Sequence, residues 1–371
     1  MKKNTTTKQS PKRRTKASQE PITIGMDLGD KTSRYCIVDG KGEVVKEGSV
    51  ATTKKGMNQV FGAMRRCRIA IEVGTHSPWV SRLLQSLGYE VIVANARQVK
   101  LISSSSRKDD RLDAQMLARL ARFDPGLLRP IQHRSEKAQQ HLMKIRVRAA
   151  LVEGRTSLVN AARGLTKALG ERLPKCDADA MCVEQMVGMP AELQETLTPL
   201  LEQVESLTEK IKECDKEIEQ IAREEYPETD LLKQIKGVGT LIALTFVLTV
   251  EDRDRFQKSR DVGCYVGLRP RRSESGERQP QLRITKEGDI YLRKLLVQGA
   301  HCIMSKRGPD TDLKRWGMKL AERGGKNAKK RAIVAVARKL AILLHRLWAT
   351  GEVYEPLRNS QAKPPVKQRA A

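Results

Sequence analysis

Residues 22–50, ITIGMDLGDKTSRYCIVDGKGEVVKEGSV, decide the fold of the first third of the chain. Three short apolar runs, ITIGMDLG, SRYCIVDG and EVVKEGSV, are joined by tight turns, with DGKG at the second turn. This pattern predicts three strands that follow one another as a meander. RIAIEV and YEVIVAN predict two further strands, and helical patterns near 54–65, 78–87 and 110–123 alternate with them.

A meander followed by alternating helices and strands predicts a mixed sheet with a parallel portion. The order of elements matches the ribonuclease H-like architecture. In that arrangement the first and fourth strands lie side by side, and the last helix packs beside their ends. We therefore expect an α/β domain over residues 21–130.

Four acidic residues stand at special places on this frame. Asp27 and Glu72 end the first and fourth apolar runs, and Asp110 and Asp113 are spaced i, i+3 at the start of the 110–123 helix. We call them the acidic quartet. Converging carboxylates supply the oxygen ligands that Mg²⁺ prefers, and bound metal ions clamp the oxygens of a phosphodiester exchange. We expect Mg²⁺, or Mn²⁺, to be the cofactor.

Each acid also has a structural interpretation. Asp27 could begin a turn, and Glu72 could pair with an arginine. Asp110 could be a helix N-cap, and Asp113 could be a first-turn acid that is favourable with the helix dipole. Taken singly, these interpretations are the stronger ones. The joint placement of all four residues favours a metal site.

The charge of the chain indicates its partner. The 371 residues include 70 Lys and Arg against 44 Asp and Glu, a net charge of +26. Such a charge favours nucleic acid or an anionic membrane. No apolar run approaches the ~20 residues that span a bilayer, so we expect nucleic acid and no membrane. The seven cysteines contain no CxxC pair, and we assign no Cys or His to a metal.

Residues 131–226 are mainly helical. Leu200, Val204, Leu207, Ile211, Cys214, Ile218 and Ile221 follow steps of four and three, which predicts a coiled-coil seam. With an earlier helix near 136–170, this segment could form an antiparallel hairpin within one chain or could pair between chains. We favour an oligomerisation region.

Residues 227–350 form a third region. KQIKGVGTLIAL contains a Gly-Val-Gly turn before an apolar helix. The turn resembles a helix-hairpin-helix unit, whose N–H groups hold a phosphate, although the glycines could equally cap two packed helices. We expect residues 1–20 to be a disordered basic arm and residues 351–371 to be a disordered tail.

Six motifs carry a family resemblance: GMDLG (25–29), IEVGTHS (71–77), KDDRLDAQMLA (108–118), IKGVGTLIAL (235–244), YVGLRPRRSESG (265–276) and ITKEGDIYLRKLLVQGA (284–300). With them the chain resembles the insertion sequence 110 family of transposases, and more closely its 1111 subgroup. The motifs cover most of residues 20–300 in the order of the family.

The resemblance implies an RNA-guided DNA recombinase that excises and inserts a mobile element. It implies a RuvC-like DEDD catalytic domain over 21–130, with the acidic quartet as metal ligands, and a C-terminal domain over 227–350 that supplies a hydroxyl nucleophile. It also implies donor and target DNA, a guide RNA of the bridge type, and a homo-oligomer, either a dimer or a tetramer. The expected location is the bacterial cytoplasm, in association with the nucleoid.

The nucleophile position departs from the family pattern. The nucleophilic serine of the family often lies in a Ser-Lys-x-Gly stretch, and here the sequence reads Thr285-Lys286-Glu287-Gly288. A threonine hydroxyl also attacks phosphorus once it is activated. We take Thr285 as the catalytic residue. Alternatively, Thr285 caps the following helix, and Ser273 or Ser275 supplies the hydroxyl.

Basic residues around this stretch are candidate nucleic-acid contacts. Arginine forms bidentate bonds with phosphate, although a solvated turn or helix face would carry the same residues. We expect contacts from Arg269, Arg271, Arg272, Lys286, Arg293, Lys329, Lys330 and Arg331. Lys286 and Arg293 could also stabilise charge on the pentacovalent phosphorus.

Two other functions fit the same residues. One is a resolvase-type, Mg²⁺-dependent endonuclease in which the acidic quartet activates water and no covalent intermediate forms. The other is a non-catalytic nucleic-acid binder whose acids only stabilise the fold. A trapped protein–DNA adduct would distinguish the recombinase from the endonuclease. For the non-catalytic binder, replacing Asp27 and Asp113 by Asn should leave every activity in the cell unchanged.

Overall fold

The computed structural model describes residues 21–95, 109–273, 280 and 282–360. The predicted N-terminal arm and residues 361–371 lie outside this part of the chain. The chain divides into two compact units, Met1–His133 and Arg134–Ala371. The second unit contains the expected 227–350 region and, from Arg134 onward, the expected 131–226 region. No helix of the described residues is long and apolar enough to cross a membrane.

Unit 1 contains a five-stranded mixed sheet in the order β3-β2-β1-β4-β5. The strands are β1 (Thr23–Asp27), β2 (Thr32–Val38), β3 (Val44–Ala51), β4 (Arg68–Glu72) and β5 (Glu90–Ala94). β1 pairs antiparallel with β2 and parallel with β4. This is the mixed sheet expected from the sequence, and it is consistent with a ribonuclease H-like domain.

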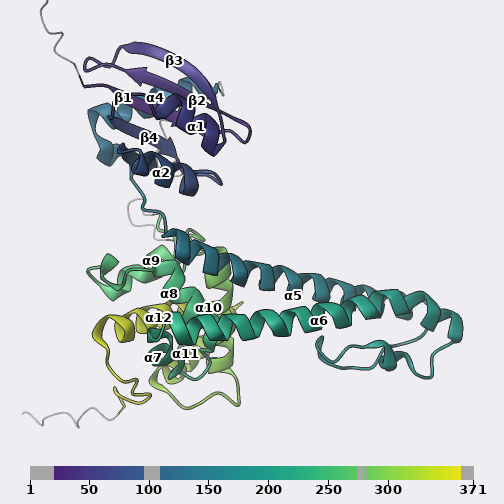
Figure 1. Cartoon of the computed structure of the whole chain (residues 1–371). Coiled ribbons are helices and arrows are strands. Elements are labelled where there is room, and N and C mark those ends of the chain that lie inside the picture. Colours follow the sequence, from purple (N-terminus) through teal and green to yellow (C-terminus); the bar gives the residue numbers. More distant parts are fainter. Residues whose placement is uncertain (1–20, 96–108, 274–279, 281, 361–371) are drawn as a thin grey trace, which may run out of the picture. The chain divides into compact units, whose positions relative to one another are not determined.

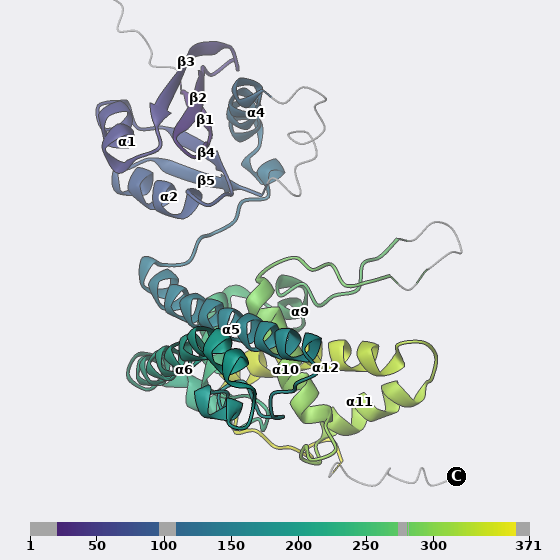
Figure 2. The same cartoon turned by 90° about the vertical axis from the view of Figure 1, so that its right-hand side faces the viewer.

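Helices cover both faces of the sheet (Figure 2). The first face packs on α1 (Lys54–Phe61) and α2 (Ser77–Ser86), and its core includes Ile69 and Ile71. The opposite face packs on α4 (Asp110–Phe123), where Ala70 meets Leu117. Because successive strand residues point to opposite faces, the run RIAIE supplies both cores. A short 3-10 turn, η1 (Pro125–Leu128), follows α4.

Small residues bring α4 close to β1. A Cβ atom at Gly25 would lie 2.1 Å from Ala114 O and 2.3 Å from Ala118 N. Only glycine leaves room for this approach of helix to strand. It brings the first turn of α4 to the end of β1, where the chain carries Asp27.

The residue that caps the N-terminus of α4 is Asp109, whereas one of the expected alternatives was Asp110. The carboxylate of Asp109, and not of Asp110, accepts the N–H of Arg111 at 3.0 Å. Asp110 and Asp113 both lie in the first helical turn. Asp109 has the extended backbone that a cap requires, which leaves the Asp110 side chain available for another role.

Unit 2 begins with a helical hairpin, α5 (Glu136–Ala168) and α6 (Ala191–Glu225), whose helices run side by side (Figure 1). Contacts from Lys144 to Glu217 and from Arg155 to Thr208 show that the helices are antiparallel. The hairpin therefore forms within one chain, the less favoured of the two expected arrangements. A short turn, η2 (Val183–Met186), lies in the connection.

The buried face of α6 differs from the expected seam at alternate positions. Val204, Ile211 and Ile218 are buried as expected. The other four expected positions are only partly buried, namely Leu200, Leu207, Cys214 and Ile221. Beside Leu200, Leu207 and Ile221, the next residue along the helix is buried instead, namely Leu201, Thr208 and Ala222. A threonine is tolerated there because Arg155 donates to its hydroxyl at 3.1 Å.

The remaining helices pack around one apolar core with the open end of the hairpin. They are α7 (Glu228–Lys233), α8 (Thr240–Val250), α9 (Val262–Tyr265), α10 (Ile290–Met304), α11 (Asp312–Glu322) and α12 (Ala328–Thr350), with short turns η3 (Arg253–Arg255) and η4 (Ser259–Asp261). Gly237 has φ +104 and Gly239 caps α8, so the Gly-Val-Gly turn does join two helices.

The expected C-terminal disorder does not include residues 351–360. The backbone N–H of Asp312 donates to Pro356 O at 2.8 Å, and Asn359 N donates back to Asp312 Oδ2 at 2.6 Å. These bonds fix the segment on the start of α11.

Candidate active site

The acidic quartet gathers at one end of the sheet of unit 1. Asp27 ends β1 and Glu72 ends β4, and the two strands are parallel neighbours with Met26 opposite Ile71. Asp110 and Asp113 project from the first turn of α4, which packs on β1. Parallel strands bring their carboxyl ends to the same edge, where ligands of such sheets bind.

The electrostatics of Asp27 reflect this convergence. Its pKa is raised from 3.8 to about 6, first by burial and then by the charges of Asp110, Glu72 and Asp113, against a smaller opposing effect of the Leu28 N–H. The pKa of Glu72 is also raised, by burial and then by the charge of Asp113. Like charges and desolvation both disfavour the ionised form, and a bound cation would offset both.

The carboxylates of the quartet do not form a tight cluster of three in the described part of the chain. Among the described residues, no three carboxylates of the quartet have ligand oxygens that all lie within 4.8 Å of one another. Nor does a described Lys or Arg nitrogen lie within 4.0 Å of an oxygen of Asp27 or Glu72. The alternative pairing of Glu72 with an arginine is thus absent from the described part of the chain.

One pair at the same edge was missed from the sequence. His76 Nε2 lies 3.3 Å from Asp30 Oδ1, and His76 Nδ1 accepts the indole N–H of Trp79 at 3.1 Å. Asp30 follows β1 and His76 follows β4. The motifs MDLGD and EVGTHS contain both residues, yet only the pairing of β1 with β4 makes them neighbours.

Thr285 lies in unit 2, in a basic loop that we define as residues 267–288. Its backbone N–H donates to Arg269 O at 2.9 Å, and Arg271 N donates to Arg283 O at 2.9 Å. The Thr285 hydroxyl oxygen is buried and has no hydrogen-bond partner among the described residues. Buried hydroxyls are almost always paired, and exceptions call for an explanation such as a functional role.

Thr285 is not the cap of the following helix. Asp289 caps α10, because its carboxylate accepts Leu292 N at 2.7 Å. Of the alternative nucleophiles, Ser273 is exposed at the described edge of the basic loop, and Ser275 lies outside the described residues.

Two family models match the chain on both sides of the helical hairpin. A model described as Transposase matches residues 24–169, and a model described as Transposase IS116/IS110/IS902 family matches residues 229–314. Together these ranges exceed half of the 371 residues. The chain belongs to the IS116/IS110/IS902 family of transposases. It is an enzyme that cleaves and rejoins DNA.

Curated relatives match the transposase over most of its length. The transposase for insertion sequence element IS1111A of Coxiella burnetii is 28% identical, over 92% of this chain and 94% of the relative. A probable family 20 transposase of Pseudomonas aeruginosa is 26% identical, over 90% of this chain and 98% of the relative. The transposase for insertion sequence element IS1328 of Yersinia enterocolitica is 26% identical, over 76% of this chain and 84% of the relative.

Most predicted basic contacts of the transposase are exposed. The exposed contacts at the described ends of the basic loop are Arg269, Arg271, Arg272 and Lys286. These two ends extend from the helices of unit 2 (Figure 2). Lys286 has a left-handed backbone, with φ +59. Three further exposed basic residues stand in the first turn of α12, namely Lys329, Lys330 and Arg331.

Arg293 differs from the other predicted contacts. Its side chain is buried, and its Nη1 donates to Val266 O at 3.0 Å and to Glu287 O at 2.8 Å. Burial lowers its pKa, against the opposing charge of Asp289. These bonds engage one nitrogen of the guanidinium and favour a structural role for Arg293, whereas its contact with nucleic acid stays a prediction.

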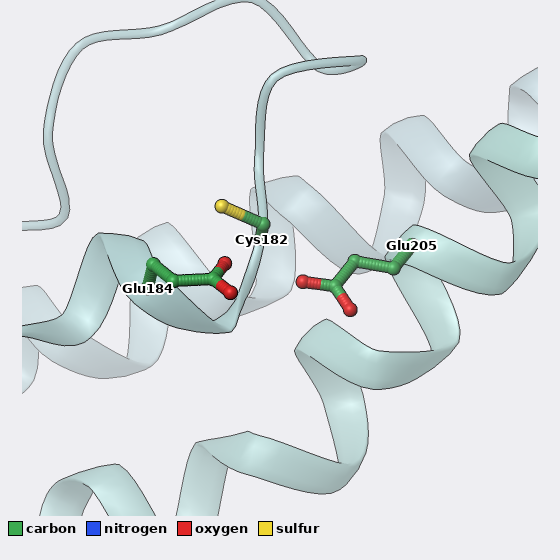
Figure 3. A group of neighbouring side chains, drawn as sticks. All are labelled: Cys182, Glu184 and Glu205. Carbon is green, nitrogen blue, oxygen red and sulfur yellow. The ribbon is translucent and has the colours of Figure 1, made fainter.

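Two other features of the transposase lie in unit 2. Cys182, Glu184 and Glu205 form the only described group of three whose ligand atoms all lie within 4.8 Å (Figure 3). Glu205 accepts the backbone N–H of Val183 at 2.8 Å, which ties η2 to α6. A groove of about 890 Å³ lies between α11, α12 and residues 353–360, and no predicted site residue lines it.

Proposed function

We propose that the acidic quartet binds divalent metal and that the transposase cleaves DNA there. The observation that carries the proposal is the placement of Asp27 and Glu72 at the ends of two neighbouring parallel strands, beside the helical turn that holds Asp110 and Asp113. The pKa of Asp27, raised first by burial and then by the charges of the other three acids, agrees with this placement. Single structural roles for these acids would not require them to approach one another against their own repulsion. Pairing with a metal supplies the reason.

The donor set of unit 1 fits Mg²⁺ or Mn²⁺. All four side chains offer carboxylate oxygens, the ligands of hard cations, and none offers sulfur. When bound, the metal would polarise a phosphate and offset the charge that develops on it. Asp27, Glu72, Asp110 and Asp113 would hold it.

We infer that Thr285 supplies the nucleophile for strand exchange. Its Oγ1 would attack the scissile phosphorus, forming an O–P bond as the bond from phosphorus to the DNA leaving oxygen breaks. The threonine proton would pass to a base and the leaving oxygen would take one up. Attack requires the buried hydroxyl to become accessible when substrate binds. A second exchange with another DNA hydroxyl would release Thr285 and rejoin the strand.

The charge of the chain supports binding of both DNA and RNA. A net charge of +26 suits donor and target DNA together with a guide RNA of the bridge type. Base pairing would then read the sequence while the protein holds the backbones. RNA that co-purifies with the full chain, survives high-salt washing and maps to the DNA flanking the gene would support guidance. Purification free of RNA, with full activity, would exclude it.

We also propose a homo-oligomer, dimer or tetramer, assembled through the helical hairpin. The supporting feature is the apolar stripe of α6 that its partner helix only partly covers, with exposed Met143 and Val147 on α5. Light scattering of the intact protein would give the mass. A monomer at micromolar concentration, with and without nucleic acid, would exclude this proposal. The working location would be the bacterial cytoplasm, at the nucleoid.

Trapping of a covalent protein–DNA adduct tests the central proposal. We expect wild-type protein with Mg²⁺ to form an adduct, Thr285→Ala to form none, and both to bind DNA equally. Asp27→Asn and Asp113→Asn should each abolish cleavage. If Thr285→Ala still cuts DNA and no variant forms an adduct, the resolvase-type endonuclease with activated water replaces the recombinase.

A further inference from the structure

One side chain holds both ends of the basic loop. Arg293, near the start of α10, is 9% exposed. The Nη1 of Arg293 donates to Val266 O, just before the loop, and to Glu287 O, near its other end, at 3.0 and 2.8 Å. Both acceptors are backbone carbonyls, so the bonds depend on the path of the chain and not on the side chains of the loop.

The backbone at these two ends is in direct contact. Gly267 has φ +71 and Gly288 has φ +76. A Cβ atom would lie 2.0 Å from Glu287 O at Gly267 and 2.0 Å from Tyr265 O at Gly288. Lys286 N also donates to Gly267 O at 3.1 Å. The two ends therefore have one tight arrangement that other residue types would disturb.

The first turn of α10, which carries Arg293, is bonded to α5. Asp289 caps α10 and pairs with Arg146 of α5, and the Arg146 guanidinium lies 4.9 Å from the ring centre of Tyr291. Arg293 N donates to Asp289 O at 3.2 Å within the first turn. The loop thus starts and ends on a support fixed by α5 and α10.

We propose that Arg293 is a positioning residue that holds together the two described ends of the basic loop, residues 267–273 and 282–288. By bonding both ends, it fixes how Arg269, Arg271 and Lys286 meet phosphates and where Thr285 stands. This inference rests on the proposed function in one respect, that the loop acts on DNA. Arginine suits the task because the planar guanidinium holds the two N–H bonds of Nη1 in fixed directions, one toward each acceptor, whereas a lysine ammonium rotates on a flexible stem.

Hydrogen exchange of the full chain tests the positioning directly. We expect Arg293→Met to speed exchange of the Thr285 and Lys286 amides about ten- to hundredfold, the effect of losing bonds to a charged donor. Amides in the middle of α8 and α12 should be unchanged. Arg293→Lys should restore part of the protection. Unchanged exchange at Thr285 and Lys286 would overturn the proposal.

Arg66→Met is the matched control. Arg66 Nη1 also donates to two backbone carbonyls, Phe61 O at 2.9 Å and Met64 O at 2.8 Å, but in unit 1 beyond the end of α1. This variant should lose comparable local order without affecting the basic loop or adduct formation.

The reaction gives the second measurement. At saturating DNA we expect Arg293→Met to form adduct about a hundredfold more slowly, because small misplacement of a reacting group costs that much, while DNA affinity changes less than tenfold. Faster exchange with a normal adduct rate would mean that Arg293 does hold the ends of the loop together. It would also mean that the loop has no role in catalysis. A slow reaction with normal exchange would mean that Arg293 touches the substrate itself, which overturns the positioning role.

Discussion

Asp27 and Glu72 end two parallel strands, one position beyond the paired residues Met26 and Ile71. The pKa of Asp27 is raised first by burial and then by the charges of Asp110 and Glu72, so the two strand-end carboxylates repel one another. The first turn of α4 adds two more acids at the same end of the sheet, Asp110 and Asp113. The relationship links the sheet topology to the proposed chemistry, and it leads to measurable consequences.

Neutralising Asp27 should stabilise unit 1 in the absence of metal. The pKa of Asp27 is raised from 3.8 to about 6. Between these two pH values, folded Asp27 keeps a proton that the unfolded chain has lost. The destabilisation is therefore absent below about pH 4 and complete above about pH 6. We expect Asp27→Asn to add about 1–2 kcal/mol at pH 7.5, after allowance for solvent screening of this partly buried group, and nothing at pH 4.

Hydrogen exchange of β1 and β4 amides with a chelator present would measure this gain. Asp39→Asn is the control in the same unit. Hydrogen bonds from backbone N–H groups, that of Glu43 first, lower the pKa of Asp39, so its replacement should give no gain. Destabilisation by Asp27→Asn at pH 7.5 would contradict the repulsion.

Metal affinity should fall as the pH drops through 6. A metal must displace the proton of Asp27, whose pKa is about 6. We expect Mn²⁺ to bind about fourfold more weakly at pH 5.5 than at pH 7.5, with release of a proton near pH 6. Calorimetry in buffers of different ionisation enthalpy would measure both. Equal affinity at the two pH values would place the metal away from Asp27.

Thr285→Val should separate stability from chemistry. The Thr285 hydroxyl is buried without a described partner, so its replacement by a methyl group should stabilise unit 2 by about 1 kcal/mol. The same variant should form no DNA adduct, and Thr285→Ser should form one. Thr208→Val is the control, because Arg155 donates to the Thr208 hydroxyl at 3.1 Å, and it should destabilise. Urea unfolding would measure each variant.

The exposed arginines of the basic loop should govern the salt dependence of DNA binding. Each phosphate contact releases counterions, so Arg269→Gln and Arg271→Gln should each reduce the slope of log K against log salt by about 0.9. Arg223→Gln, a surface change on α6, should leave the slope unchanged. Titration by fluorescence anisotropy between low and moderate salt would show it. Slopes equal to wild type would remove the loop from the interface.

Paired alanine variants should identify the buried face of α6. Leu201 is fully buried, whereas Leu207 is only partly buried. We expect Leu201→Ala to cost about 2–5 kcal/mol and Leu207→Ala less than half as much. Denaturant unfolding of the two variants side by side would decide. Equal losses would favour the heptad positions expected from the sequence.

Much of the fold and of the candidate site follows from local sequence. The alternation in RIAIE predicts a strand whose faces both pack, and an Asp or Glu at the end of an apolar run predicts a polar group at a sheet edge. For the same reason the acidic quartet and the basic stretch near Thr285 were visible without a structure. Residue types and short spacings carry this information because they act over one strand or one helical turn.

The rest depended on contacts between distant parts of the chain. Only tertiary packing showed that Arg293 faces two carbonyls and not solvent, because its acceptors at Val266 and Glu287 are brought together by the path of the basic loop. Only packing chose Leu201 over Leu200 for the buried face of α6, since both are leucines at helical spacing. The sequence by itself determined which chemical groups this transposase has, and the tertiary structure decided which of them are free to act, because burial and hydrogen bonding are set by neighbours far along the chain.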